Sequence, residues 1–178
     1  MSNSMLAPAN PNPPAGGLNK SAPNKPQKSI GDAYLRFQLE RETIAVLPLE
    51  HAQEVVVVPI GGITPIPRKP ACIRGLINRR NKLLWACDLA QMLGLTPLDA
   101  NAQQYNVAII RAGQLPLGLL VQEVKGVSRF TRDTIQSPVG AVGSNLTPYL
   151  RGCILEQKEL LLVLDPEAIV NAAILHGN

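Results

Sequence analysis

Short apolar runs alternate with polar or proline- and glycine-rich breaks along most of the chain, in the rhythm of β-strands. The first run, YLRFQL, is apolar at every second position (Leu35, Phe37, Leu39), as in a strand with one buried face. ERE interrupts it, and TIAVLPL at 43–49 follows as a second strand, which predicts a hairpin. Pro48 cannot donate a ladder hydrogen bond, so we expect this strand at an edge or near a bulge.

Three more hairpins are predicted further along the chain. IRGLINRR and KLLWACDL flank Asn81, the non-glycine residue best able to take positive φ in a tight turn. YNVAIIRAGQLPLGLLVQEV turns at 112–114, and YLRGCILEQKELLLVLDP turns near 156–158. With the strand-like pieces EVVVV and KGVSRF, the pattern predicts eight to ten short strands.

Only two or three short helices are expected. Asp88 can cap DLAQMLGL, with Gly94 after its end, and Asp165 can cap PEAIVNAAILHG, where Pro166 suits the first turn and Gly177 follows. Strands therefore follow strands directly, without the crossover helices of a βαβ fold. The fold class is mainly β, as barrels or a sandwich.

Two segments lack this periodicity. Residues 1–33 open with MSNSMLAPANPNPPAGGLNKSAPNKPQKSI, which has almost nothing to bury and predicts a disordered tail, leaving 34–175 as the folded domain. PIGGITPIPRKP at 59–70 predicts an extended connector within the domain.

Composition supports a packed domain of ordinary charge. Of the 178 residues, 46% are apolar, 17% charged and only 3% aromatic, so the core is built from Leu, Ile, Val and Ala. The net charge is +4; Lys20, Lys25 and Lys28 against Asp32 give the tail +2, which leaves +2 for the whole body. That is too little for a general nucleic-acid-binding face.

A local basic cluster nevertheless stands out in the hairpin 68–82. It contains no acid and holds six basic residues: Arg68, Lys69, Arg74, Arg79, Arg80 and Lys82. A nucleic-acid site also needs interleaved aromatics, and only Trp85 is near, where it reads better as a core or groove-lining residue. A small β-barrel nucleic-acid binder using this hairpin stays open as the alternative function.

Two arginines of this cluster, Arg79 and Arg80, are adjacent on a predicted strand and therefore point to opposite faces. At least one then turns towards the body of the fold and needs an acidic partner. We expect Glu54 to pair with Arg80, with non-additive effects of alanine substitutions at the two positions.

Catalytic and metal chemistry finds little support. Asp88 and Asp165 are explained as helix caps, and His51 and His176 do not sit at metal-ligand spacing. The pair Gly61-Gly62 precedes neither a helix nor Lys-Ser/Thr, so it is no phosphate loop. We expect no enzyme activity, no cofactor and no metal.

The compartment is read from the cysteines and from the absence of targeting segments. Cys72, Cys87 and Cys153 form neither a CxxC pair nor a disulfide framework, so we expect buried thiols in a reducing cytoplasm. The chain shows no signal peptide and no apolar run long enough to span a membrane.

A family resemblance runs through these same segments. ITPIPRKPACIRGLINRRNKLLWACDLAQMLG closely resembles the central motif of CheW-like chemotaxis coupling domains. AVLPLEHAQEVV, YNVAIIRAGQLPLGLLVQEVKGVSRF and YLRGCILEQKELLLVLDPEAIV are similar to that family's other hairpins and terminal helix, in order, over about 34–175.

The resemblance implies a fold and two partners. The fold is two five-stranded, SH3-like β-barrels on a shared core, with short helices and with the second barrel at about 83–148. The partners are the cytoplasmic tip of a chemoreceptor and the regulatory domain of a CheA-type histidine kinase, which a non-enzymatic adaptor couples. The protein would be cytoplasmic and recruited to membrane-associated receptor arrays.

The resemblance also implies a receptor-binding groove. Its candidate residues are Ala52, Glu54, Arg74, Asn78 and Arg80, with Asn81 in the turn; no kinase-binding residue is assigned, although the second barrel carries most of that contact. The chain departs from the family at Arg79, where a leucine is usual, at Asn81, where a glycine is usual, and at Trp85. A system for pilus motility or phototaxis fits these departures at least as well as flagellar chemotaxis.

Overall fold

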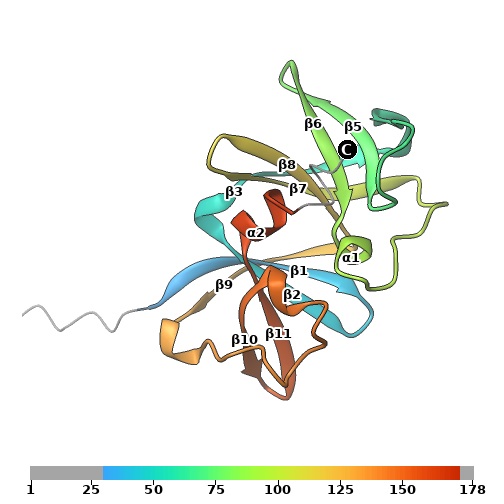
Figure 1. Cartoon of the computed structure of the whole chain (residues 1–178). Helices are drawn as coiled ribbons and strands as arrows, with labels where there is room; N and C mark the ends of the chain where they lie inside the picture. Colours follow the sequence, from blue (N-terminus) through green and yellow to red (C-terminus); the bar gives the residue numbers. More distant parts are fainter. Residues whose placement is uncertain (1–29, 173–178) are drawn as a thin grey trace, which may run out of the picture.

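The computed structural model describes residues 30–172, which form two β-sheets, one above the other in Figure 1, with short helices between them. Most of the predicted tail, residues 1–29, lies outside the described residues, as do His176 and Gly177. The first strand begins at Asp32, one residue before the predicted end of the tail.

The lower sheet of Figure 1 has five strands in the order β10-β11-β2-β1-β9. Its strands are β1 (Asp32–Glu40), β2 (Thr43–Pro48), β9 (Glu123–Phe130), β10 (Leu150–Glu156) and β11 (Glu159–Leu164). The predicted β1–β2 and β10–β11 hairpins are present, and β11 joins them by pairing parallel to β2. Beyond β9, Gln136 exchanges two backbone hydrogen bonds with Cys153 of β10, which partly closes the sheet on itself.

The upper sheet has six strands in the order β3-β7-β8-β6-β5-β4. Its strands are β3 (Ala52–Pro59), β4 (Ile63–Thr64), β5 (Ile73–Arg79), β6 (Lys82–Asp88), β7 (Gln104–Ala112) and β8 (Leu115–Val121). The two edge strands, β3 and β4, are consecutive in the chain and are joined by the 3-10 turn η2 (Ile60–Gly62). One continuous segment therefore supplies both edges, and the sheet curls as an incomplete barrel.

The mainly β fold with two sheets and short helices is confirmed, but two details were wrong. The second sheet has six strands, because the predicted connector 59–70 contains the two-residue strand β4. The boundary of about 83–148 is also wrong: the upper sheet begins at Ala52, and β9, which lies inside that range, pairs with β1 of the other sheet. The sequence of this strand, KGVSRF, contains no local signal that decides which sheet it joins.

Pro48 is another correction. The strand β2 is internal, between β11 and β1, and Pro48 is its last residue. The parallel pairing with β11 involves Ile44 to Val46 only, so the missing proline N–H interrupts no ladder on that side.

The alternation of apolar residues distributes side chains over both faces of each sheet. On β8, Leu117 and Leu119 face the core between the sheets, whereas Leu120 belongs to a second cluster on the other face. On β11, Leu162 faces the shared core and Leu161 a third cluster. Runs such as GLLV and LLLV are continuous in apolar residues because both faces of these strands are buried.

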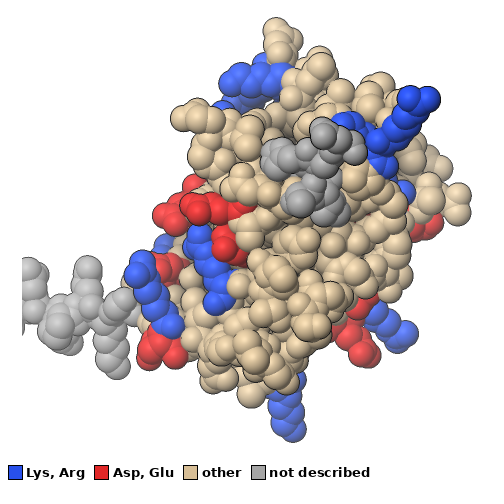
Figure 2. Space-filling model, viewed as in Figure 1, with Lys and Arg blue, Asp and Glu red and all other residues tan. Residues whose placement is uncertain are grey.

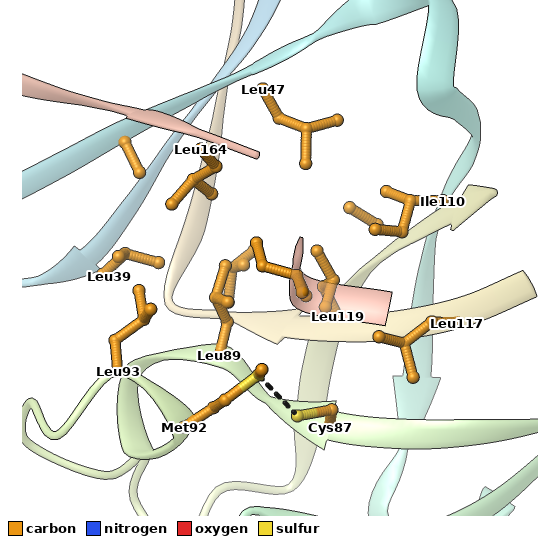
Figure 3. Close-up of a cluster of buried hydrophobic side chains, with 14 of the residues drawn as sticks. Leu39, Leu47, Cys87, Leu89, Met92, Leu93, Ile110, Leu117, Leu119 and Leu164 are labelled. Atoms are coloured by element: carbon orange, nitrogen blue, oxygen red, sulfur yellow. Dashed lines mark hydrogen bonds between the residues drawn. The ribbon is translucent and has the colours of Figure 1, made fainter. Parts of the chain in front are cut away.

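Two short helices complete the shared core, as Figure 3 shows for α1. The helix α1 (Leu89–Met92) buries Leu89 and Met92 against Leu39 and Leu119 from the two sheets. The helix α2 (Pro166–Val170) buries Ile169 and Val170 in the same core. Both helices thereby pack into the core that the two sheets share.

The predicted helix starts are confirmed. Asp88 accepts a hydrogen bond from the Gln91 N–H, and Asp165 accepts hydrogen bonds from Glu167 and Ala168. Gly94 has the expected positive φ of 76°. The C-terminal helix is shorter than predicted and ends at Val170, where Asn171, a poor helix former, leaves the helical region of φ and ψ.

The three cysteines are buried free thiols, as predicted. The Cys87 Sγ lies 3.8 Å from the Met92 Sδ in the shared core (Figure 3). A hydrogen bond with the Cys72 thiol and burial both raise the pKa of Cys87 above its ordinary value, which keeps it protonated and unreactive.

Candidate functional site

Several charged side chains surround a depression at the β5–β6 end of the upper sheet, which we call the basic hollow. It has a volume of about 480 Å³ and is lined by Arg79, Arg80, Lys82, Arg111 and a single acid, Glu54. Strand alternation explains the grouping. Four apolar residues of this face pack in one cluster: Val56, Ile77, Leu84 and Ile109. Each has a charged residue two positions away on the same strand and on the same face, namely Glu54, Arg79, Lys82 and Arg111.

Glu54 is held mainly by Arg79. The Arg79 Nε donates to Glu54 Oε2 at 3.2 Å, and the Arg79 Nη2 donates to Glu54 Oε1. The Arg80 Nη2 lies 3.6 Å from the same Oε1, outside good hydrogen-bond distance. The side chain of Glu54 is 22% exposed, that of Arg79 42% and that of Arg80 78%.

The predicted pairing of Glu54 with Arg80 is therefore corrected, because Arg79 is the principal partner. The prediction assumed that both arginines lie on the strand, but β5 ends at Arg79. Arg80 and Asn81 have φ of 50° and 62° and form the two-residue turn. In this turn Arg80 leaves the strand alternation and reaches the same carboxylate from outside.

We predict that the Glu54 carboxyl titrates below the range of an ordinary glutamate. Hydrogen bonds from Arg79, then its charge and that of Arg80, lower the Glu54 pKa. The ion pair should thus persist at neutral pH and be lost as the pH falls through this lowered pKa. A carboxyl-detected NMR titration checks it: Arg79→Ala should return the Glu54 pKa towards its ordinary value more than Arg80→Ala does. A larger rise with Arg80→Ala would contradict the assignment.

Arg74, another predicted groove residue, makes its hydrogen bonds within the protein. Its Nη2 donates to Asp88 Oδ2 at 2.8 Å and to the Leu98 carbonyl at 3.2 Å. Asp88 has no exposed surface and also accepts the backbone N–H groups of Gln91 and Leu98. Arg74 therefore clamps the start of α1 to the following loop, away from the basic hollow.

The remaining predicted groove residues divide between two places. Ala52 packs against the core between the sheets, at the start of β3. Asn78 is exposed on β5, and its neighbour Arg79 faces the hollow, so Asn78 projects to the other face of the strand. Of the six candidates, the structure gathers only Glu54, Arg80 and the turn at Asn81.

The basic cluster 68–82 does not form one continuous face. Arg74 is bound to Asp88, Arg79 to Glu54, and the Lys69 Nζ lies 5.1 Å from the centroid of the Trp85 ring. Trp85 is half-buried and packs against the shared core, in agreement with the core alternative of the prediction. On the face that Figure 2 displays, Lys and Arg are likewise scattered, and several of those on its left side lie beside Asp and Glu.

Arg111 is the hollow residue that the sequence reasoning missed. Its backbone carbonyl accepts a hydrogen bond from the His51 Nδ1 at 3.0 Å, which ties β7 to the turn η1 (Leu49–His51) between the sheets. Its Nε is buried and has no hydrogen-bond partner. The available signal was the arginine that directly follows the apolar run VAII.

A second depression, of about 560 Å³, lies at the opposite end of β7 and contains none of the predicted site residues. Its Glu40 carboxylate already accepts the Thr96 N–H at 2.9 Å and the Thr43 hydroxyl at 3.1 Å, and these bonds lower the Glu40 pKa. We therefore regard Glu40 as part of a structural contact between the two sheets, with its hydrogen bonds already satisfied within the protein.

Metal and membrane chemistry find no support within residues 30–172. No group of three or more His, Cys, Asp or Glu side chains in this part of the chain is placed to hold a metal ion. No helix among the described residues is long and apolar enough to cross a bilayer.

Comparison with known proteins identifies the domain. Residues 33–173 match the family model of the CheW-like domain. The chain is 31% identical to a probable chemotaxis protein CheW of Rhizobium etli over 60% of this chain and 68% of that protein. It is 29% identical to protein PilI of Pseudomonas aeruginosa over 70% of this chain and 67% of that protein.

The fold is shared with a solved structure. The crystal structure of the scaffolding protein TtCheW from Thermoanaerobacter tengcongensis superimposes with a TM-score of 0.66, at 24% identity, covering 76% of this chain and 89% of that one. Two curled sheets on one shared core are thus the fold that this chain has in common with that protein. The chain belongs to the CheW-like domain family, whose members are non-enzymatic scaffolds of chemotaxis-type signal transduction.

Proposed function

We propose that this protein couples a methyl-accepting chemoreceptor to a CheA-type histidine kinase and acts in the cytoplasm at membrane-associated receptor arrays. The observation that carries the proposal is the CheW-like match over 33–173, nearly all of the described chain. The similarity to PilI supports a system for pilus motility as the controlled behaviour.

The surface of the upper sheet is suited to protein docking. Val55 and Val57 on β3 are 44% and 54% exposed, and Leu83 beside the β5–β6 turn is 69% exposed. By strand alternation these side chains project from the face opposite to that of Glu54 and Lys82. Exposed apolar side chains are typical of protein interfaces, where apolar contacts supply affinity and charges fix register. We assign receptor contact to Glu54, Arg80 and the Asn81 turn. Ala52, at the start of β3, and Asn78, on the other face of β5, are kept as further candidates for this contact. We assign kinase contact to the second, six-stranded sheet.

Capture from the native cell extract tests this function. The full-length chain with an affinity tag should retain both a histidine kinase and a receptor, identified by mass spectrometry. Arg80→Glu should lower receptor recovery at least about tenfold, because it reverses a charge at the contact, and should leave kinase recovery unchanged. Recovery of nucleic acid instead, lost steeply as salt rises, would overturn the proposal in favour of a nucleic-acid binder.

A further inference from the structure

The basic hollow carries more positive charge than the protein itself balances. Four cations line it, from three strands and a turn, and Glu54 is the one acid among them. Arg79 takes both oxygens of that carboxylate. The internal ion pair leaves three cationic groups around the hollow without a carboxylate of their own.

These three groups differ in how they are held. Arg80 is 78% exposed and reaches Glu54 only at 3.6 Å. Within residues 30–172, neither Lys82 nor Arg111 has a carboxylate oxygen within ion-pair distance. Arg111 also keeps a buried Nε without an acceptor, and a buried donor that lacks its partner is costly.

We propose that the basic hollow is a binding site for a pair of carboxylate side chains on a segment of a protein partner, with Arg111 and Lys82 as residues that bind them. The inference rests on the proposed adaptor function and deepens it, because it names the chemistry of the docked segment. Arginine presents a planar fork that matches a carboxylate, so Arg111 fixes the orientation of one acid while Arg80 and Lys82 attract the other.

The Arg79–Glu54 pair determines the sign of the partner. A free Glu54 would accept a basic residue from the docked segment, but here both of its oxygens are already engaged by Arg79. A basic residue would meet only like charges at this site. The hollow therefore selects acidic segments and rejects basic ones.

The shape of the hollow favours a protein segment over a nucleic acid. Its lining includes Leu84, Ile109 and Pro116, which offer apolar contact to aliphatic side chains. No aromatic residue lines it to stack a base, and Trp85 projects from the opposite face of β6 to Leu84. A helix with two acids four positions apart presents carboxylates on neighbouring turns of one face, a spacing that the cations can span.

Peptide titration tests the inference on the full-length chain. The probe is a synthetic 15-residue helical peptide with two glutamates four positions apart, compared with the same peptide carrying glutamines or lysines there. We expect the glutamate peptide to bind, and the glutamine and lysine peptides to bind at least about tenfold more weakly, since each charged hydrogen bond lost costs about one order of magnitude. Backbone amide shifts on β5, β6 and β7 locate the bound peptide.

Variants separate the hollow from general positive charge. Arg111→Gln and Lys82→Gln should each weaken the glutamate peptide at least about fivefold. Arg129→Gln, which removes the same charge from an exposed site on β9, is the matched control and should leave binding unchanged. Because Lys82 is exposed, its variant retains the fold even if Arg111→Gln does not.

Three results would overturn the inference. They are equal binding of the three peptides, equal weakening by the control variant, and tighter binding of a 20-nucleotide single-stranded DNA that Arg111→Gln abolishes. The outcome is separable from that of the proposed function. If the chain captures receptor and kinase but shows no preference for the glutamate peptide, only the inference about the hollow is contradicted. If the wild-type chain captures neither protein, the proposed function is contradicted, whatever the result of the peptide titration.

Discussion

Replacing Asp88 by alanine is expected to lower the free energy of unfolding by about 3–5 kcal/mol, the usual result of removing one partner of a buried ion pair. The Asp88 carboxylate is fully buried and serves Arg74, the Gln91 N–H and the Leu98 N–H. Its loss leaves the Arg74 guanidinium and two backbone donors without their acceptor and removes the cap of α1. Denaturant unfolding with fluorescence of Trp85 measures the change.

A matched control and a second variant make this result interpretable. Asp133→Ala removes an exposed aspartate from the turn η3 (Arg132–Thr134) and should change stability by less than about 0.5 kcal/mol. Arg74→Ala should cost less than Asp88→Ala, because the aspartate keeps its backbone donors and Arg74 is already 25% exposed. Equal losses of unfolding free energy for Asp88→Ala and Asp133→Ala would show that the interactions of Asp88 with Arg74 and the two backbone N–H groups are not formed.

The second large effect is expected at Gly75, where the β5 backbone passes close to β4. Gly75 has φ of 143°, and a Cβ there would lie 2.1 Å from the Thr64 carbonyl oxygen. Gly75→Ala should therefore cost about 3 kcal/mol or more, from backbone strain of about 1–3 kcal/mol and overpacking of similar size. Thermal unfolding followed by circular dichroism measures it.

Gly113 offers the comparison that isolates the close contact. It also has positive φ, 59°, but a Cβ there would meet nothing within 4 Å. Gly113→Ala should cost only the left-handed conformation, about 1–2 kcal/mol. If the two substitutions destabilise the protein equally, the β5 backbone at Gly75 does not pass as close to β4 as described.

Much of the fold follows from local sequence pattern. Alternation and turn residues predict the four hairpins, and Asp88 and Asp165 predict the starts of both helices. The pairings between distant segments do not follow, because neither the parallel pairing of β11 with β2 nor the antiparallel pairing of β9 with β1 has a local cause. These pairings decide which strands share a sheet.

The site was less predictable for a related reason. The partner of Glu54 depended on whether Arg80 lies on the strand or in the turn, a difference of one residue that reverses the direction of a side chain. Arg111 is distant in sequence from the basic cluster and reaches the hollow only through the pairing of β7 with β3. Arg74 looked like a surface charge because its acceptor, Asp88, was already explained as a cap.

Reconstitution tests most directly whether this chain works as a physical link between two proteins. Receptor-containing membranes are mixed with the histidine kinase and increasing amounts of the full-length chain, and the kinase in the membrane pellet is measured. We expect the kinase to sediment with the membranes only when the chain is present, and its recovery to reach a plateau once the chain is stoichiometric with the kinase. Kinase recovery that does not depend on the chain, or that saturates at trace amounts of it, would show that the chain is not a physical link.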